Sequence, residues 1–525
     1  MRWPPAIALA AGLALSLGCR GCGSPPPAPP ERFVPAGARA AVIVPGIDGA
    51  AADAGALLRA AASFPGAAAL PEAHAAVASQ LGLDPVDPRA LERAGIDASR
   101  GAALAWSGGK LVLVLPVRDR GDLVDLVARL ARDRAGATSR ATERVGGVEV
   151  STFGAPGREP AAALAFRDRT ALLASGPGAQ AAVAAAASLE PAASLDEDVR
   201  YRALRRALGE GRAAIAFLPP GAFPPARAEG SPSGAMAAAV EASEARLTIA
   251  AAILPPEGGS FADLAAGPAS PAPLAALAPA AATAAWNGDP GALARRLLPL
   301  APARDREWLA ARGIDLQRDV FDLLGPGAAG AASLAPGAGI AALSGDVLRT
   351  DPIRLLRFEA VAPLRDAARA REVSARIARL AGARPGAAGA GPSRYRVRTR
   401  SGEIAWEIDA ARARIALAGG APGGLDALLG RLAAAPAGGA GAGALAGGLG
   451  GLALDVPRLV ESVRALPPEA FGEGPNAFVL RSVVDRFVAP AEGLAAVSLR
   501  ADLADGALRL VIEVEARAAG TGGPR

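Results

Sequence analysis

The chain has 525 residues, of which 51% are hydrophobic, so it can form two or more domains with apolar cores and is not a disordered protein. Its formal net charge is only +5, its arginines alternate with acidic residues, and only 4% of its residues are aromatic. A nucleic-acid-binding protein usually concentrates positive charge on one face and adds aromatic side chains that stack on bases, so we expect no nucleic-acid partner.

The N-terminus begins with Met1-Arg2, continues as an apolar stretch from Ala6 to Leu17, and leads through Gly18 to Cys19. This stretch is shorter than the roughly 20 residues that span a bilayer, so it predicts a processed targeting signal. A small residue before the cysteine is typical of bacterial lipoproteins, and the segment resembles their signal peptides. The resemblance implies that residues 1–18 are removed and that Cys19 carries the lipid. An ordinary secretory peptide that happens to end at a cysteine is the alternative.

Residues 19–35 predict a tether, because the run from Ser24 to Pro30 is rich in proline and favours an extended, semi-rigid conformation. Arg20 is not the aspartate that retains many lipoproteins at the inner membrane, so we expect an exported protein anchored in the outer membrane. Cys22 is a poorer lipidation candidate, because Arg20 would lie inside its recognition stretch. With Cys19 acylated, Cys22 has no partner and the fold cannot depend on an internal disulfide.

The first half of the body, residues 36–262, alternates short strands with helices. We expect a hairpin of Ala102–Trp106 and Lys110–Val117, followed by a helix with Leu123 and Val127 on its apolar face. The other predicted strands are Ala38–Val44, Val148–Phe153, Ala161–Phe166, Thr170–Ala174, Ala213–Leu218 and Arg246–Leu254. The other predicted helices are Gly55–Ala78, Ala179–Ser188, Asp196–Leu208 and one more before Arg246.

The second half, residues 273–516, repeats this order after a linker at residues 263–272, and a polar tail at residues 517–525 ends the chain. Arg312-Gly313-Ile314-Asp315 stands where Ala94-Gly95-Ile96-Asp97 stands in the first half. The same succession twice predicts a duplication. Strands that meet through short turns, with helices between them, predict an α+β fold of two tandem, duplicated domains, each a mainly antiparallel sheet packed with helices.

Several landmarks of the first half are similar to those of a bacterial envelope protein family of unknown function. They are the start Pro35-Ala36-Gly37-Ala38, the Gly-Ile-Asp segment before a hairpin, and Gly146-Gly147-Val148 before a strand pair and a helix. The resemblance covers Pro35 to Leu218 and extends more loosely to the second half. It supports the tandem architecture and implies no activity.

The sequence offers no catalytic, cofactor or metal site. His74 is the only histidine, which excludes multi-histidine zinc sites, and its alanine-rich context predicts a partly exposed helix residue. Ser107-Gly108-Gly109-Lys110 matches the Ser-x-x-Lys pattern of serine acylases and contains the only lysine. Those enzymes place the pair at a helix start, whereas here it falls on a hairpin turn, so we do not expect catalysis at Ser107.

Two further patterns have ordinary explanations. The run from Gly325 to Gly330 fits Gly-x-Gly-x-x-Gly, but it neither follows a strand nor opens a helix, as a dinucleotide loop must, so we predict a loop. The glycine-rich run from Gly438 to Gly451 is predicted to be a loop for the same reason. Ser194 with Glu197 predicts a capping box at a helix start rather than a metal site with Asp196 and Asp198.

The sequence therefore predicts an envelope lipoprotein that binds or scaffolds another envelope component without catalysis. The alternative is a carrier for an apolar ligand or lipid, held in a cavity between sheet and helix, because both faces of Leu111–Leu115 are apolar. An enzyme of unknown type is the third possibility.

Overall fold

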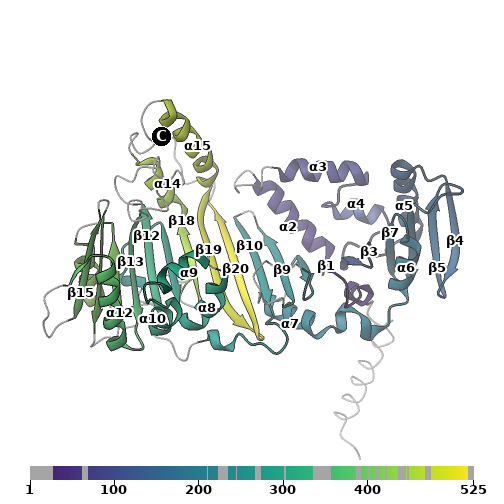
Figure 1. Cartoon of the computed structure of the whole chain (residues 1–525). Coiled ribbons are helices and arrows are strands. Elements are labelled where there is room, and N and C mark those ends of the chain that lie inside the picture. The colour runs from purple at the N-terminus through teal and green to yellow at the C-terminus, as the bar shows by residue number, and fades with distance from the viewer. Residues whose placement is uncertain are drawn as a thin grey trace, which may run out of the picture.

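A computed structural model describes residues 28–61, 69–209, 211–222, 234–243, 245–265, 274–300, 303–334, 356–385, 392–399, 402–409, 414–420, 423–434, 445, 448–466 and 475–517 (Figure 1). The first half contains strands β1 (Ala40–Val44), β2 (Ala102–Ser107), β3 (Lys110–Pro116), β4 (Ser139–Val145), β5 (Val148–Gly154), β6 (Ala162–Arg167), β7 (Thr170–Ser175), β8 (Ala214–Leu218), β9 (Met236–Ala242) and β10 (Arg246–Ile253). Its helices are α2 (Ile47–Ala60), α3 (Leu70–Leu81), α4 (Pro88–Arg93), α5 (Arg120–Ala135), α6 (Ala179–Ala187) and α7 (Val199–Leu208).

The second half contains strands β11 (Ala282–Trp286), β12 (Ala328–Leu334), β13 (Leu356–Pro363), β14 (Arg384–Pro385), β15 (Ser393–Thr399), β16 (Gly402–Asp409), β17 (Arg414–Gly419), β18 (Gly450–Asp455), β19 (Leu494–Ala504) and β20 (Ala507–Ala516). Its helices are α8 (Pro290–Leu297), α9 (Ala303–Ala310), α10 (Leu316–Asp319), α12 (Ala367–Leu380), α13 (Gly424–Ala434), α14 (Val456–Arg464) and α15 (Pro475–Ala491). The chain is thus a mixed α+β protein.

All described strands form one continuous antiparallel sheet. Its order is β4-β5-β6-β7-β3-β2-β1-β8-β9-β10-β20-β19-β18-β11-β12-β13-β17-β16-β15-β14. Counted outward from the β10–β20 pair, each strand of the second half holds the position of the strand numbered ten lower in the first half. The two halves therefore have the same strand connectivity.

The β10–β20 pair is the seam between the two halves. Its register runs without interruption from Arg246 opposite Glu515 to Ile253 opposite Leu508, and the Arg246 guanidinium lies 3.0 Å from the Glu515 carboxylate. Because backbone hydrogen bonds continue across the seam, neither half ends in a free edge there.

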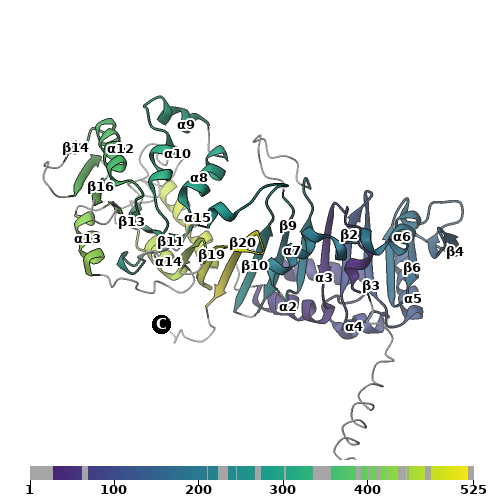
Figure 2. The same cartoon turned by 90° about the horizontal axis from the view of Figure 1, so that it is seen from below.

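One face of the sheet forms the main core. Its side chains include Ile43, Phe217 and Val511, and they pack against α6 and α7 in the first half. Leu428 of α13 covers the corresponding face of the second half. Figure 2 shows α6 and α7 together along one side of the first-half strands, with α2 to α5 on the other side.

The opposite face is covered by helices only in parts. α5 packs Leu123 and Val127 against this face in the first half, and α12 packs against the stacked rings of Tyr395 and Trp406 in the second. Several large apolar side chains between these regions stay exposed. We call this side the open face.

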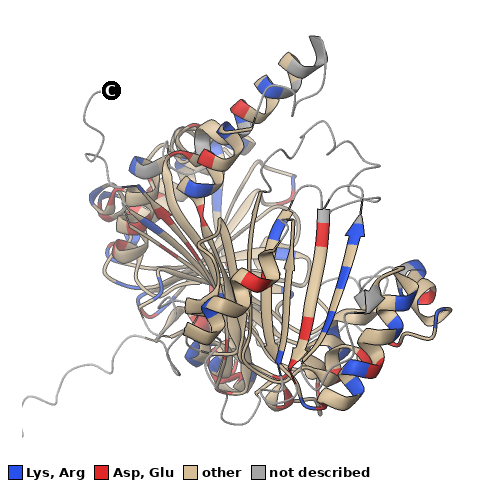
Figure 3. Ribbon diagram, turned by 90° about the vertical axis from the view of Figure 1, so that its left-hand side faces the viewer, with Lys and Arg blue, Asp and Glu red and all other residues tan. Residues whose placement is uncertain are grey.

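Charged residues concentrate on the helices and on the outer strands of the second half, as Figure 3 shows. β15 and β16 carry a ladder of opposite charges, in which Arg394 pairs with Glu407, and the Arg396 side chain lies 2.8 Å from Glu403. These pairs neutralise acids that are almost fully buried on this outer part of the sheet.

The structure contains the predicted hairpin as β2 and β3 and the predicted amphipathic helix as α5, but it corrects other predictions. The helix expected before Arg246 is instead strand β9, and the helical material expected from Gly55 to Ala78 forms two helices, α2 and α3. Alanine favours helices in isolation, but the alanines of β9 alternate between the two faces of the sheet, and pairing with β8 and β10 outweighs that preference.

The predicted capping box is wrong as well. The side chain of Asp198, not that of Ser194, caps α7 by accepting hydrogen bonds from the backbone of Arg200 and Tyr201, while the Ser194 hydroxyl donates to the carbonyl of Pro191. Aspartate directly before the helix accepts more effectively than a serine that lies one 3-10 turn earlier.

The two Gly-Ile-Asp segments are not equivalent. The N–H of Asp97 donates to the carbonyl of Pro116, whereas in the second half the N–H of Gly325 donates to Pro363. Asp315 instead caps α10. In the second half, Gly325 rather than Asp315 therefore occupies the position equivalent to that of Asp97.

The predicted linker begins too early. Asp263 and Leu264 form part of a 3-10 helix, with Leu264 buried against Leu449 and Asp263 paired to Arg296 at 2.6 Å. Residues 266–272 of the linker lie outside the described residues, as do residues 518–525 of the tail.

Candidate ligand-binding site

An apolar pocket of about 550 Å³ lies between α2, α3 and the strands β1 to β3. Its floor includes Val44, Ala102 and Leu115, which are neighbours across the three strands. Its walls and roof are formed by Ile47, Ala50, Ala51, Ala54, Leu57, Leu58, Leu70, Ala73, His74, Val77, Pro85, Val86, Leu91 and Ile96. The lining is apolar except for His74, and the volume falls within the range of about 300–1,000 Å³ that is typical of small-molecule sites.

The sequence of α2 and α3 explains why they line the pocket. Ala50, Ala54 and Leu57 of α2 lie on one stripe of the helix, because residues three and four apart share a face. Leu70, Ala73 and Val77 form the same pattern on α3. The α2 stripe contains two alanines and the α3 stripe one, and these small side chains leave space above the sheet.

The roof helix α3 is attached loosely to the body. None of its residues is buried, and Val77 is 44% exposed although its side chain lines the pocket. Two polar contacts connect it to other segments: Nε2 of His74 lies 2.9 Å from Oδ1 of Asp84, and Arg134 of α5 donates to the carbonyl of Gln80 at 2.6 Å. A helix with so little buried surface costs little to displace, as ligand entry requires.

Asp84 holds this contact in place. Hydrogen bonds from the backbone of Val86 and from His74 hold the pKa of the Asp84 carboxyl below its usual value. His74 is the partly exposed helix residue that the sequence predicts, but it also connects the roof of the pocket to the loop before α4. The Asp84-Pro85 turn is the sequence signal from which this partner could be found, whereas the helical context of His74 alone does not indicate it.

The pocket floor continues into the open face. Side chains two residues apart on a strand share a face, so Val42, Leu104 and Leu113 extend the surface formed by Val44, Ala102 and Leu115. Within the described ranges, every large apolar strand residue that is exposed lies on this face. These residues are Val42, Leu104, Trp106, Leu111, Val240, Leu356, Leu452 and Ile512.

This alignment follows from the register across the sheet. Val240 faces Ile249, Ile249 faces Ile512, and Leu499 joins Ile512 to Leu452. Contiguous exposed apolar surface of this kind marks binding sites on soluble proteins. The pocket and the open face therefore form one apolar surface that reaches across the seam.

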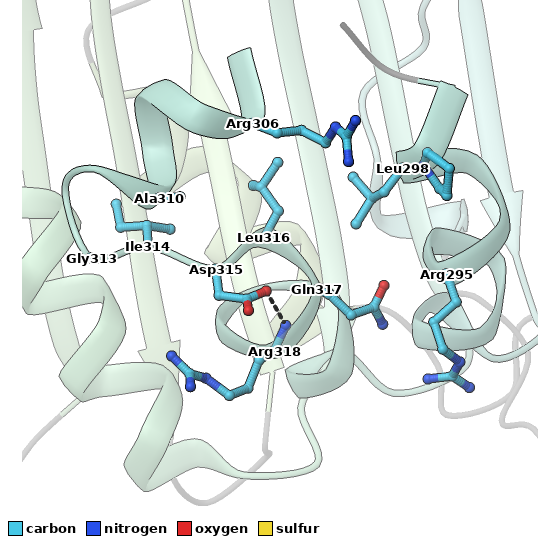
Figure 4. Close-up of a pocket in the computed structure, with 11 residues that line it drawn as sticks. Arg295, Leu298, Arg306, Ala310, Gly313, Ile314, Asp315, Leu316, Gln317 and Arg318 are labelled. Carbon is cyan, nitrogen blue, oxygen red and sulfur yellow. Dashed lines mark hydrogen bonds between the residues drawn. The ribbon is translucent and has the colours of Figure 1, made fainter. Parts of the chain in front are cut away.

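A second pocket, of about 520 Å³, lies between α8, α9 and α10, which follow β11 as α2, α3 and α4 follow β1. Its lining is mixed, with Leu298 and Leu316 beside Arg306 and Gln317, as Figure 4 shows. The Asp315 carboxylate accepts a hydrogen bond from the backbone of Arg318 at the start of α10. The two halves thus carry pockets of different chemistry at matching places.

Asp319 is the most deeply buried carboxylate near this second pocket. Burial by itself would raise its pKa, but hydrogen bonds from Arg318, from the backbone of Asp315 and from Arg369 hold the pKa well below its usual value. The Arg369 guanidinium lies 2.8 Å from Oδ1 of Asp319. This ionised carboxylate ties α10 to α12 and has a structural role.

The other predicted features lie as follows. Ser107 faces Lys110 across the hairpin turn, as predicted. Gly325 and Gly327 precede β12, so this glycine run leads into a strand rather than a helix, and Ala328–Gly330 belong to that strand instead of the predicted loop. Most of the run from Gly438 to Gly451 lies outside the described residues, and its last two residues begin β18.

Cys19, Cys22 and the run from Ser24 to Pro27 also lie outside the described part of the chain. Within the described part, no group of three or more His, Cys, Asp or Glu residues is arranged to hold a metal ion. The same residues include no helix long and apolar enough to cross a membrane.

No protein-family model and no curated protein matches the sequence. Among solved structures, crystal form III of TP0453 is 9% identical, with a TM-score of 0.25, over 44% of this chain and 82% of that chain. Crystal form I of TP0453 is 11% identical at the same TM-score, over 44% of this chain and 79% of that chain. These values do not establish a shared fold.

Proposed function

We propose that this protein binds an apolar ligand, such as the acyl chain of a lipid, in the pocket between α2, α3 and β1 to β3. The observation that carries the proposal is the chemistry of the pocket: a volume of about 550 Å³ lined by apolar side chains under a helix that has no buried residue. An acyl chain would gain free energy there by leaving water, at about 25 cal/mol per Å² of buried apolar surface.

We also propose that the protein is an exported lipoprotein anchored in the envelope through Cys19, with the outer membrane as its destination. The N-terminal sequence supports this, and an anchored carrier would be kept close to a source of apolar ligand. Binding or scaffolding of another envelope protein is the second candidate, supported by the exposed apolar side chains of the open face. The proposal includes no catalytic step.

We further propose that the two halves arose by duplication, as domains of about residues 36–262 and 273–516. The support is the shared strand connectivity, together with a sequence landmark that occurs once in each half, at the end of β3 and of β13. Its two occurrences are Pro116-Val117-Arg118-Asp119 and Pro363-Leu364-Arg365-Asp366, in which each aspartate caps the following helix. The difference between the two pockets fits a duplication in which one copy kept or acquired an apolar site.

The test is the binding of a fluorescent fatty acid to the purified full mature chain. Ala54→Phe places a large side chain in the pocket, and Ala52→Phe places the same side chain on an exposed position of the same helix outside the pocket lining. We expect Ala54→Phe to raise Kd at least about tenfold, since single methylene changes in apolar pockets alter binding by about 10–200-fold. The Ala52→Phe control should bind as the wild type does.

Native mass spectrometry of protein extracted from its own membrane supplies the second measurement. A lipid that accompanies the wild type and is depleted from Ala54→Phe supports the proposal. Equal fatty-acid binding by the two variants would overturn it, and a protein partner in place of a lipid would favour scaffolding.

A further inference from the structure

We propose that the tip of the β2–β3 hairpin is a membrane-contact site that docks the body on a lipid surface. The tip carries Trp106 and Leu111, which face each other across the two strands and are 46% and 57% exposed. A tryptophan beside an aliphatic side chain at an exposed tip suits the bilayer interface, where the indole ring can lie among headgroups while leucine enters the acyl region.

Basic groups flank this apolar pair. Lys110 directly precedes Leu111 at the start of β3, and its side chain lies on the other face of the hairpin tip, beside Gly178. The exposed Arg39 donates its backbone N–H to the carbonyl of Trp106 at 2.7 Å. Neither cation pairs with an acidic side chain among the described residues. Positive charge at the tip complements an anionic lipid surface. Each basic residue near the headgroups raises membrane affinity about fivefold.

The turn itself allows a close approach. Gly108 and Gly109 both have positive φ, at 57° and 77°, and a Cβ atom built on either would meet no other atom within 4 Å. The tip is therefore narrow and unobstructed, so Trp106 and Leu111 can reach a surface without displacing other parts of the protein.

The length of the tether is sufficient for this orientation. Pro30 packs against Gly101, at the opposite end of β2 from the turn. The distance from Gly101 to Gly108 along the strand is about 23 Å at roughly 3.3 Å per residue. The eleven residues from Cys19 to Pro29 can span about 34 Å as an extended proline-rich segment, so the hairpin tip can touch the membrane that holds the anchor.

The hairpin tip also connects the membrane with the pocket. From Trp106 and Leu111, the apolar side chains of Leu104, Leu113 and Val42 continue along the open face to the pocket floor. Contact at the tip would place one end of this apolar strip at the lipid surface. The inference rests on the proposed anchor for its geometry, whereas the docking itself does not require a ligand in the pocket.

The experiment uses the chain from residue 19 to 525 with Cys19→Ser, which lacks the acylated thiol and keeps every described residue. Flotation with vesicles of phosphatidylcholine and phosphatidylglycerol, at a ratio of three to one, measures docking alone. We expect the unlipidated chain to bind and Trp106→Ser/Leu111→Ser to lose at least about tenfold in affinity. Lys110→Glu should weaken binding to these vesicles and leave the weaker binding to pure phosphatidylcholine unchanged.

The chain offers a matched control. Trp308 and Leu297 are 56% and 52% exposed on α9 and α8, so Trp308→Ser/Leu297→Ser removes the same residue types from another site. This variant should bind vesicles as the parent chain does. Failure of the unlipidated parent to bind, or equal losses in the two double variants, would overturn the inference.

A third variant tests the competing apolar site. Phe478 of α15 is 79% exposed, and if Phe478→Ser abolished flotation while the hairpin variant still bound, the docking surface would be α15 and the inference would be wrong. Fatty-acid binding by each variant separates the two proposals, because loss of the docking site should leave the pocket intact.

Discussion

The phenolic hydroxyl of Tyr201 donates a hydrogen bond of 3.0 Å to Oε1 of Glu31, a residue 170 positions earlier in the sequence. Arg205 donates to the same oxygen at 3.1 Å, and the Tyr201 ring packs edge to face against Phe217. Glu31 is only 2% exposed, so these two donors compensate for the loss of water around its carboxylate. The first described turn of the chain is thereby fixed to α7.

Tyr201→Phe should destabilise the protein by about 1.5–3 kcal/mol, the usual contribution of a hydrogen bond to a charged group. Burial, followed by the charge of Glu31, raises the pKa of Tyr201 far above its usual value. A raised folded-state pKa contributes stability that is present below the unfolded pKa of about 10 and is lost as pH rises towards the folded value.

Urea unfolding at pH 8 to 11 measures both effects. The free energy of unfolding of the wild type should fall over the upper part of this pH range. The same free energy should fall less steeply with pH for Tyr201→Phe. Identical slopes in the two proteins would contradict the role of the buried phenol.

Asp319→Asn should weaken the attachment of α10 to α12 by about 2–3 kcal/mol, because three arginines lose the charge that they share. Since the folded-state pKa of Asp319 is depressed, its contribution is present above the unfolded pKa of about 3.9 and is lost as pH falls towards the lower folded value. The thermal unfolding temperature should therefore fall less steeply between pH 5 and pH 2 for the variant than for the wild type.

A surface carboxylate provides the control for Asp319. Asp322 is 40% exposed and lies 3.4 Å from Arg295, so Asp322→Asn should cost less than about 1 kcal/mol. Equal effects of the two substitutions would show that the burial of Asp319 is unimportant.

Cys19→Ser should release the body from the membrane fraction or leave an uncleaved precursor, because acylation needs the thiol at this position. Cys22→Ser should do neither. Fractionation of cells followed by mass measurement of the N-terminal peptide distinguishes the outcomes. A correctly cleaved Cys19→Ser protein that stays in the membrane after a carbonate wash would refute the proposed lipid anchor.

Ser107→Ala should leave folding and cellular phenotype intact, because Ser107 and Lys110 flank a hairpin turn rather than the helix start at which Ser-x-x-Lys enzymes place their nucleophile. Circular dichroism and complementation of a deletion strain are the measurements. Loss of complementation by a folded, anchored Ser107→Ala protein would point to an enzyme.

The hairpin and α5 could be predicted because their patterns are local. In β2 and β3 a short glycine turn joins two apolar runs, and the leucines and valines of α5 recur at helical spacing. β9 could not be predicted in this way, since its run of alanines carries a helical preference that only its two neighbouring strands override.

The sequence predicts the apolar pocket only as one of two alternatives. Both faces of Leu111–Leu115 are apolar, but that pattern fits a strand covered on both sides as well as a strand beside a cavity. The distinction depends on how α3 lies over the pocket floor. That placement depends on contacts between His74 and Asp84 and between Arg134 and the Gln80 carbonyl, which no periodicity encodes.

The seam between β10 and β20 imposes an order on the folding of the molecule. In the proposed export the N-terminus of the chain emerges first, and Arg246 can pair only after Glu515, 269 residues later, has followed. Until then β10 presents Leu247, Ile249 and Ala251 along an unpaired edge of a finished half-sheet, the kind of edge on which other chains aggregate. A chain that stops before β20 leaves that edge permanently open.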